Sequence, residues 1–244
     1  LGTDNFGQAV IVKGYQSEGH DSAHPDYGNI GKRQGGEEDF KVLLEESEKY
    51  NTKVGVHINH TESYPESKYY AQVASTVNGW SWYDDAKQII RENDILNEVS
   101  GMGARLDELK EKAPGLDWVY VDVYGDGRWP SHKLSKKLQE NGWAIASEYA
   151  SAMSNTSIWG HHINSTHNGT GNLLRFVNHQ TQENFGNSTL FRGQKDGRIN
   201  GFCGWQGASD YNETIKSFFT EILPNKYLMN FPMSQWEKSD EAVF

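Results

Sequence analysis

The chain has 244 residues, of which 23 are basic and 33 acidic, so its formal net charge is −10. An acidic chain without a run of Lys and Arg repels polyphosphate, which predicts that nucleic acid and anionic membranes are not its partners. The sequence has no run of about 18 apolar residues, which predicts no membrane insertion, and residues 1–20 lack the plan of a signal peptide. The length suits one domain, expected over residues 1–244.

Short apolar runs with strand character alternate with helical patterns along the chain. Strands are predicted, in chain order, at residues 8–16, 53–59, 117–125, 143–150, 157–164, 199–207 and 227–235. Helices are predicted at residues 36–50, 71–77, 84–93, 104–113, 132–142 and 211–223, with Gly142 as a helix stop. This alternation predicts an α/β fold with a parallel sheet. Together with the length it predicts a (β/α)8 TIM-type barrel, in which one strand is irregular or lies upstream of Leu1.

Polar side chains recur where the predicted strands end. In a barrel the active site forms at the carboxyl ends of the strands, so polar residues there indicate function. Any single one could equally cap a strand or hold a loop, but this alternative weakens when several strands share the pattern. The residues concerned are Lys13, His20, Asp21, His57, Asn59, Asp122, Glu148 and Gln206.

Two of these residues are carboxylates on neighbouring predicted strands. Asp122 ends the run "WVYVDV" and Glu148 follows "WAIAS". They could form ion pairs with an inward Lys or Arg. Glycoside hydrolysis, however, requires a pair of carboxyl groups across the scissile bond, one attacking or activating water and the other protonating the leaving oxygen.

Two tryptophans, Trp80 and Trp82, lie one residue apart in "NGWSWYDD". At this spacing tryptophans more often fill a core than line a sugar site, although the neighbouring Gly and Ser favour a site. A single Cys203 excludes a disulfide within the chain and a cysteine-based metal centre. The consecutive residues His161 and His162 would point to opposite faces of a strand and cannot chelate one ion. We expect neither a metal nor a cofactor.

Five blocks of the sequence, in order between about Val10 and Tyr211, resemble the catalytic barrel of the endo-α-N-acetylgalactosaminidases, glycoside hydrolase family 101. They are "KGYQSEGHDSAHPDYGNIGKRQGG", "GVHINHTESYPESKYY", "GLDWVYVDVYGDG", "GWAIASEYA" and "GWQGASDYN". Members of this family are large, with flanking β-sandwich domains, so the chain is expected to be the core of a larger multidomain enzyme. It departs from the family at Tyr149, where a tryptophan is expected.

The resemblance implies a retaining enzyme, secreted or at the cell surface, that releases the O-glycan disaccharide Galβ1-3GalNAc from Ser or Thr of mucin-type glycoproteins. By matching motifs, it implies that Asp122 is the nucleophile and Glu148 the acid/base. It implies sugar contacts for Asp21, His57, Trp80, Trp82 and Gln206. Two other readings remain open: a catalytically silent glycan-binding barrel, and an exo-acting hydrolase of the α-galactosidase kind.

Overall fold

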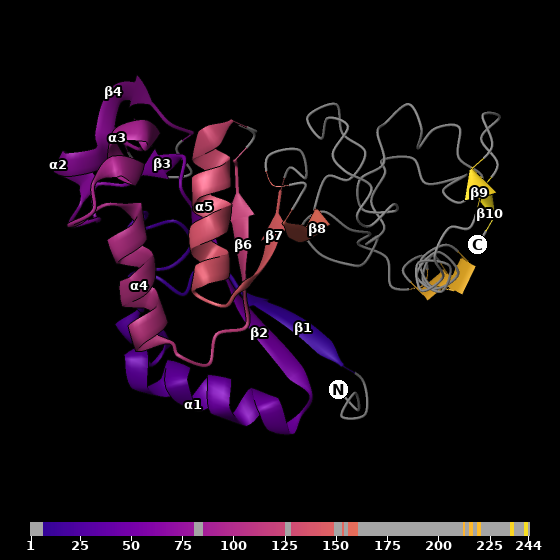
Figure 1. Cartoon of the computed structure of the whole chain (residues 1–244). Helices are drawn as coiled ribbons and strands as arrows, with labels where there is room; N and C mark the ends of the chain where they lie inside the picture. The colour runs from indigo at the N-terminus through magenta and orange to yellow at the C-terminus, as the bar shows by residue number, and fades with distance from the viewer. Residues whose placement is uncertain are drawn as a thin grey trace.

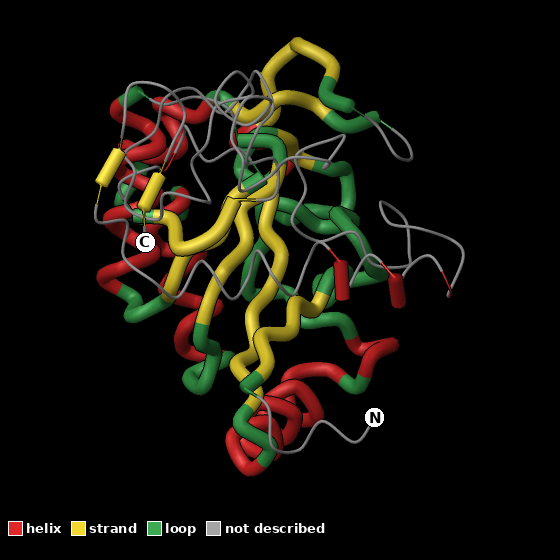
Figure 2. The backbone as a smooth tube through the Cα atoms, turned by 90° about the vertical axis from the view of Figure 1, so that its right-hand side faces the viewer, coloured by secondary structure: helices red, strands yellow, loops and turns green. Residues whose placement is uncertain are grey.

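A parallel sheet forms the centre of the molecule. The computed structural model describes residues 7–80, 85–124, 128–148, 153 and 156–160, and beyond them only residues 212, 215, 216, 219, 220, 235, 236, 242 and 243. Five strands pair in the order β1-β2-β6-β7-β8, and every pairing is parallel (Figure 1). They are β1 (Gln8–Val12), β2 (Thr52–Asn59), β6 (Trp118–Asp122), β7 (Ala144–Ser147) and β8 (Ser157–Gly160). In Figure 2 the strands run side by side through the middle of the molecule.

Three amphipathic helices supply the apolar side chains that pack against the sheet. They are α1 (Gly36–Lys49), α4 (Met102–Lys112) and α5 (Trp129–Glu140). Helix α1 has three acidic residues in its first turn, where they complement the helix dipole, and α5 has a proline at its start, which suits that position. Gly142 follows α5 with a positive φ of 82°, as the predicted helix stop requires. A short 3-10 helix, η1 (Lys32–Gln34), precedes α1.

The core lies between these helices and one face of the sheet. Val54, Val56 and Ile58 of β2 belong to one buried cluster with Leu106 and Leu109 of α4. The same cluster includes Val119 and Val121 of β6, Ile145 of β7, and Leu134 and Leu138 of α5. The alternation of side chains along each strand therefore commits one face to the core and leaves the other for a different use.

The segment between β2 and β6 differs from the sequence prediction. It forms an antiparallel sheet of order β3-β5-β4, made of β3 (Glu62–Ser63), β4 (Ala74–Asn78) and β5 (Lys87–Ile89). Helix is confined to α2 (Tyr70–Val73) and α3 (Arg91–Leu96), so the predicted helices at 71–77 and 84–93 are wrong over 74–77 and 87–89. Short apolar runs do not distinguish helix from strand, and here Thr, Val and Ile favoured pairing.

The predicted helices at 36–50, 104–113 and 132–142 are confirmed as helices. The first five predicted strands, from 8–16 to 157–164, are confirmed as strands where they are described. The predicted strand at 199–207, nearly all of that at 227–235 and most of the helix at 211–223 lie outside the described residues. The last described elements, β9 (Gln235–Trp236) and β10 (Ala242–Val243), pair antiparallel. The α/β class with a parallel sheet is confirmed, and closure into an eight-stranded barrel stays a prediction.

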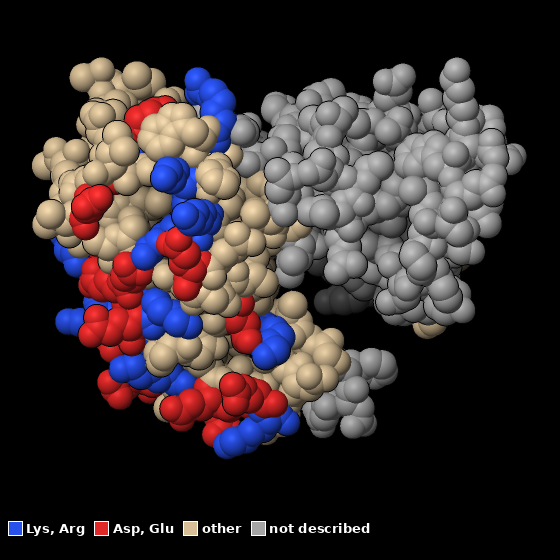
Figure 3. Space-filling model, viewed as in Figure 1, with Lys and Arg blue, Asp and Glu red and all other residues tan. Residues whose placement is uncertain are grey.

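The surface formed by the helices carries charges of both signs. Figure 3 shows acidic and basic side chains interspersed over this face, and several form ion pairs, such as Lys41 with Glu37 and Lys137 with Asp107. Within the described residues no helix has both the length and the apolar character needed to cross a membrane.

Candidate active site

The face of the sheet away from the helices carries the polar side chains. His57 and Asn59 alternate along β2 with the core residues Val56 and Ile58, and their partners across the β2–β6 pairing are Tyr120 and Asp122. Tyr120 also stacks on the His57 ring, with centroids 5.8 Å apart. Because register is fixed by the core on the opposite face, these side chains necessarily share one surface.

Asp122 and Glu148 lie at the carboxyl ends of adjacent parallel strands. Val121 pairs with Ser147, so the next positions, Asp122 and Glu148, lie side by side across one strand spacing of about 4.8 Å. Two hydrogen bonds fix the arrangement: the Glu148 N–H donates to Val121 O at 2.9 Å, and the Val123 N–H donates to Glu148 Oε2 at 2.7 Å. The carboxyl group of Glu148 therefore reaches the backbone directly after Asp122.

The backbone is unusual where Asp122 leaves its strand. Val123 has a φ of +45°, which is rare for a β-branched residue and costs on the order of 1–3 kcal/mol. This conformation directs the Val123 N–H to Glu148 and its carbonyl to the Thr61 hydroxyl, at 3.0 Å. The strained residue thus links the two carboxylate-bearing strand ends to the loop after β2.

His57 is the contact that controls the charge of Asp122. Its Nε2 lies 3.1 Å from Asp122 Oδ2, and the His57 side chain is buried. Burial alone would raise the pKa of Asp122, but His57 outweighs burial and holds this pKa below its ordinary value. Lys13 also lowers it, whereas Asp21 opposes the shift. Asp122 is therefore ionised at neutral pH.

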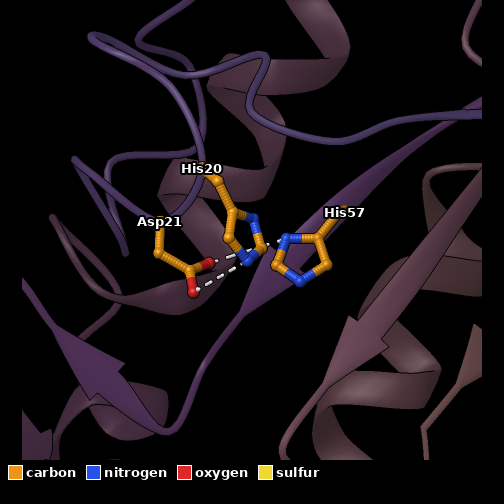
Figure 4. A group of neighbouring side chains, drawn as sticks. All are labelled: His20, Asp21 and His57. Atoms are coloured by element: carbon orange, nitrogen blue, oxygen red, sulfur yellow. Dashed lines mark ion pairs between the residues drawn. The ribbon is translucent and has the colours of Figure 1, made fainter. Parts of the chain in front are cut away.

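Asp21 lies on the other side of His57, and Figure 4 shows it with His20 and His57. Its carboxylate oxygens lie 3.0 Å from His24 Nε2, 3.5 Å from His20 Nε2 and 3.6 Å from His57 Nδ1. Burial would raise the pKa of Asp21, but these imidazoles outweigh it and lower the pKa to about 2. Burial also lowers the pKa of His20 to about 4.

The hydrogen bonding of this group is incomplete. Among the described residues, Asp21 Oδ1, His24 Nε2 and His57 Nε2 are buried atoms without a partner of hydrogen-bond geometry, although their mutual distances are short. A buried polar atom left unsatisfied costs about 1–3 kcal/mol. Polar groups of a bound molecule could complete these hydrogen bonds.

A metal ion is the other occupant that this chemistry allows. His20, Asp21 and His57 each offer one ligand atom, and these atoms lie within 4.8 Å of one another. Two imidazoles and a carboxylate are a common ligand set for zinc and other transition metals. The same donors and acceptors also suit the hydroxyl groups of a sugar, so the expectation of a site without metal stays a prediction.

Of the other residues that the sequence analysis considered for a site, the structure describes Trp80 and leaves several outside the described residues. Trp80 is 69 % exposed, so the reading of this residue as a core plug is wrong. Trp82, Gln206, Cys203, His161 and His162 lie outside the described residues.

Sequence reasoning missed two residues of the site, His24 and Glu62. Both are buried. His24 could have been found from its spacing, three residues after Asp21 in "HDSAH". Glu62 carries no such signal, because it lies on a two-residue strand that the sequence pattern does not indicate.

A parallel α/β sheet with two carboxylates side by side at its carboxyl end is the arrangement of glycoside hydrolases built on barrels. The chain belongs to the endo-α-N-acetylgalactosaminidase family, glycoside hydrolase family 101, whose sequence profile matches residues 1–215. A protein of Renibacterium salmoninarum named "Putative endo-alpha-N-acetylgalactosaminidase" is 38 % identical over 248 residues. That match covers 97 % of this chain and 16 % of the relative, so the chain spans about a sixth of that protein's length.

Solved structures agree with the fold. The α-N-acetylgalactosaminidase NagBb from Bifidobacterium bifidum, in a quadruple mutant, superposes with a TM-score of 0.52 at 16 % identity, over 66 % of this chain and 30 % of NagBb. Its complex with GalNAc gives a TM-score of 0.50 at 17 % identity, over 64 % of this chain and 29 % of NagBb. At this identity the likeness concerns the fold alone.

Proposed function

We propose that this chain carries the catalytic centre of a retaining endo-glycosidase that releases Galβ1-3GalNAc from Ser or Thr of mucin-type glycoproteins. The single observation that carries the proposal is the position of Asp122 and Glu148 on neighbouring strand ends, with the Val123 N–H bound to Glu148. Retaining enzymes hold their two carboxyl groups about 5–5.5 Å apart, and inverting enzymes about 6.5–9.5 Å. One strand spacing favours the shorter separation.

In the first step Asp122 attacks the anomeric carbon of GalNAc, and the bond to the Ser or Thr oxygen breaks. Glu148 donates a proton to that oxygen, which leaves as the hydroxyl group of the protein. In the second step Glu148 accepts a proton from water, the water oxygen displaces Asp122, and the sugar leaves with its original anomeric configuration. The contact with His57 suits Asp122 to this role because it keeps the carboxylate ionised before attack.

Asp21 and His57 are proposed to bind sugar hydroxyl groups, and their short contacts without hydrogen-bond geometry support this role. Trp80 and Trp82 are proposed to stack on the sugar face, and Gln206 to contact the sugar through its amide. The whole enzyme is proposed to be secreted or at the cell surface, where mucin-type glycoproteins are found.

The test is incubation with a p-nitrophenyl glycoside of the disaccharide and identification of the sugar product. Release of intact Galβ1-3GalNAc, first formed as the α anomer, is expected. Release of a monosaccharide would indicate an exo-acting hydrolase instead. Binding of the disaccharide without any release would indicate a silent glycan-binding barrel.

A further inference from the structure

Glu62 is a buried carboxylate next to the catalytic residues that no step above uses. It begins β3, three residues after Asn59, the β2 residue that pairs with Asp122. Burial raises its pKa, hydrogen bonds from the Trp80 backbone and from Asn59 lower it, and the charges of Asp21 and Asp122 raise it further. Glu62 Oε2 accepts a hydrogen bond from Asn59 Nδ2 at 3.1 Å, and Asn59 pairs with Asp122, which places Glu62 beside the site.

Both oxygens of Glu62 accept hydrogen bonds, and each bond leads to a different part of the site. Oε1 accepts from the Trp80 N–H, and Oε2 accepts from Asn59 Nδ2 at 3.1 Å. The carbonyl of Trp80 accepts from the Tyr64 hydroxyl at 3.3 Å. Two side chains of the β3 segment therefore hold the backbone of Trp80 on both sides, while its indole remains exposed.

The side-chain amide of Asn59 cannot flip, because its oxygen is fixed by two backbone donors. Its Oδ1 accepts from the backbone N–H groups of Thr61, at 2.8 Å, and Glu62, at 3.1 Å. The Nδ2 group must therefore face Glu62 as a donor. Because Trp80 also presents a donor, the residue between them must accept on both sides, which an ionised carboxylate does and an amide does not.

Gly79 shows how closely Glu62 approaches this loop. A Cβ added at Gly79 would lie 2.9 Å from Glu62 Oε1, and the nearest atoms around it all belong to the Glu62 side chain. The residue before Trp80 therefore has to be small because the carboxylate occupies the space beside it. The backbone N–H of Gly79 is separately bound to Ala86 O at 2.8 Å.

We propose that Glu62 is a positioning residue: by accepting from Asn59 and from the Trp80 N–H, it fixes the backbone from which the exposed Trp80 indole reaches the sugar. The inference rests on the proposed function for the identity of that sugar. It adds a cause for the placement of Trp80 to the Tyr64 and Gly79 hydrogen bonds, in a loop that is otherwise at the surface. Such a loop would have to be ordered at each binding event, at a cost to affinity.

The first measurement is hydrogen exchange of the Trp80 amide, which reports the bond to Glu62 directly. Glu62→Gln should speed this exchange roughly tenfold or more. Asn59 Nδ2 and the Trp80 N–H are both donors, so the NH₂ group of the new glutamine faces one of them and that hydrogen bond is lost. Glu108→Gln is the matched control, since Glu108 is a part-buried acid on α4 bound to Lys68 and Lys112. It should leave exchange at Trp80 unchanged.

The second measurement separates binding from chemistry with the p-nitrophenyl disaccharide glycoside. Glu62→Gln should raise KM roughly tenfold while changing kcat much less, because Trp80 is displaced and the two catalytic carboxylates remain. Tyr64→Phe, which removes the hydroxyl that binds the Trp80 carbonyl, should act in the same direction with a smaller effect. Rapid exchange at Trp80 with an unchanged KM would show that the indole does not contact the sugar and would overturn the proposal.

Gly79→Ala provides a second route if Glu62→Gln fails to fold. The added methyl group should displace the carboxylate and speed exchange at Trp80, but it should have no further effect in a Glu62→Ala background, where the obstructing atoms are gone. Unchanged exchange in both Glu62→Gln and Gly79→Ala would refute the role of Glu62. If the wild-type chain released no disaccharide, the proposed function would fail, and the exchange measurements would still decide whether Glu62 holds Trp80.

Discussion

Two buried clusters each contain an aspartate and histidine, but they differ in the hydrogen bonds that the aspartate oxygens accept. In the first, Asp94 accepts from Arg105 through both of its oxygens, at 2.9 and 2.6 Å, and lies 2.8 Å from His60 Nε2. Arg105 uses its other donors on the carbonyls of Pro25 and Ser100. In the second, the ion-pair partners of Asp21 among the described residues are His20, His24 and His57, and Asp21 Oδ1 has no partner of hydrogen-bond geometry.

The pKa of the aspartate is lowered to about 2 in both clusters, so the pKa does not distinguish them. Hydrogen bonding does. Both oxygens of Asp94 accept hydrogen bonds, although His60 Nδ1 in the same cluster has no partner among the described residues, and the cluster fixes α3 and α4 to the loop that carries Asp21. The Asp21 cluster keeps polar atoms without regular partners next to Asp122, as a site that binds a polar ligand does. Within the described part of the chain, the difference between the clusters therefore lies in the oxygens of the aspartate: both are hydrogen-bonded in Asp94, and Oδ1 is not in Asp21.

The largest expected effect separates the two clusters by activity alone. Asp122→Ala should reduce turnover of every substrate by a factor on the order of 10⁶, because no leaving group can replace the nucleophile. Asp122 is at the end of its strand and is not part of the core, so the melting temperature should change little. Kinetics together with thermal unfolding measure both quantities, and substantial activity on any substrate would show that Asp122 is not the nucleophile.

Glu148→Ala should slow substrates with poor leaving groups by about 10²–10⁴-fold, since general acid catalysis is lost. An aryl glycoside whose phenolate leaves unaided should still form the covalent intermediate. Added azide should then speed its breakdown and give the α-azide, because the β-linked intermediate is attacked with inversion. Product analysis by NMR decides the matter: a β-azide would mean that the roles of the two carboxylates are reversed.

The Asp94 cluster should respond in stability instead. Arg105→Ala leaves a buried aspartate without its main partner and should lower the free energy of unfolding by about 3–5 kcal/mol. Asp21→Asn should lower it less, because the shape is kept and asparagine tolerates the φ of 64° at this position. It should nevertheless reduce activity. Urea unfolding of both variants compares the clusters directly, and equal losses of stability would remove the distinction.

The smallest effect concerns pH. The pKa of His20 is lowered from 6.5 to about 4 by burial, opposed by Asp21 and assisted by His57, Lys13 and His24. Between pH 6.5 and about 4, His20 is therefore protonated in the unfolded chain and neutral in the folded chain. The free energy of unfolding falls as pH falls through this range. His20→Gln should remove up to about 2–3 kcal/mol of this loss. Chemical unfolding at pH 7 and pH 4.5 tests it, and an unchanged pH slope would contradict it.

The parallel α/β class, the place of His57 on its strand and the strand ends at Asp122 and Glu148 could be predicted because alternation along a strand is a local property. The same local rules failed over 74–77 and 87–89, where pairing with another strand decided the conformation. They also could not reveal which buried acids are satisfied. Asp94 accepts hydrogen bonds from Arg105, 11 positions away, and Glu62 accepts from the backbone N–H of Trp80, 18 positions away.

The sequence by itself determined which residue types stand at the ends of the strands, and through them the family. Only the tertiary structure decided that Asp122 meets His57, that the Val123 N–H binds Glu148 and that Glu62 holds Trp80. The physical reason is that patterns of 2.0 and 3.6 residues report which face a side chain occupies. Hydrogen bonds between segments depend instead on the register and loop geometry that packing sets for the whole chain.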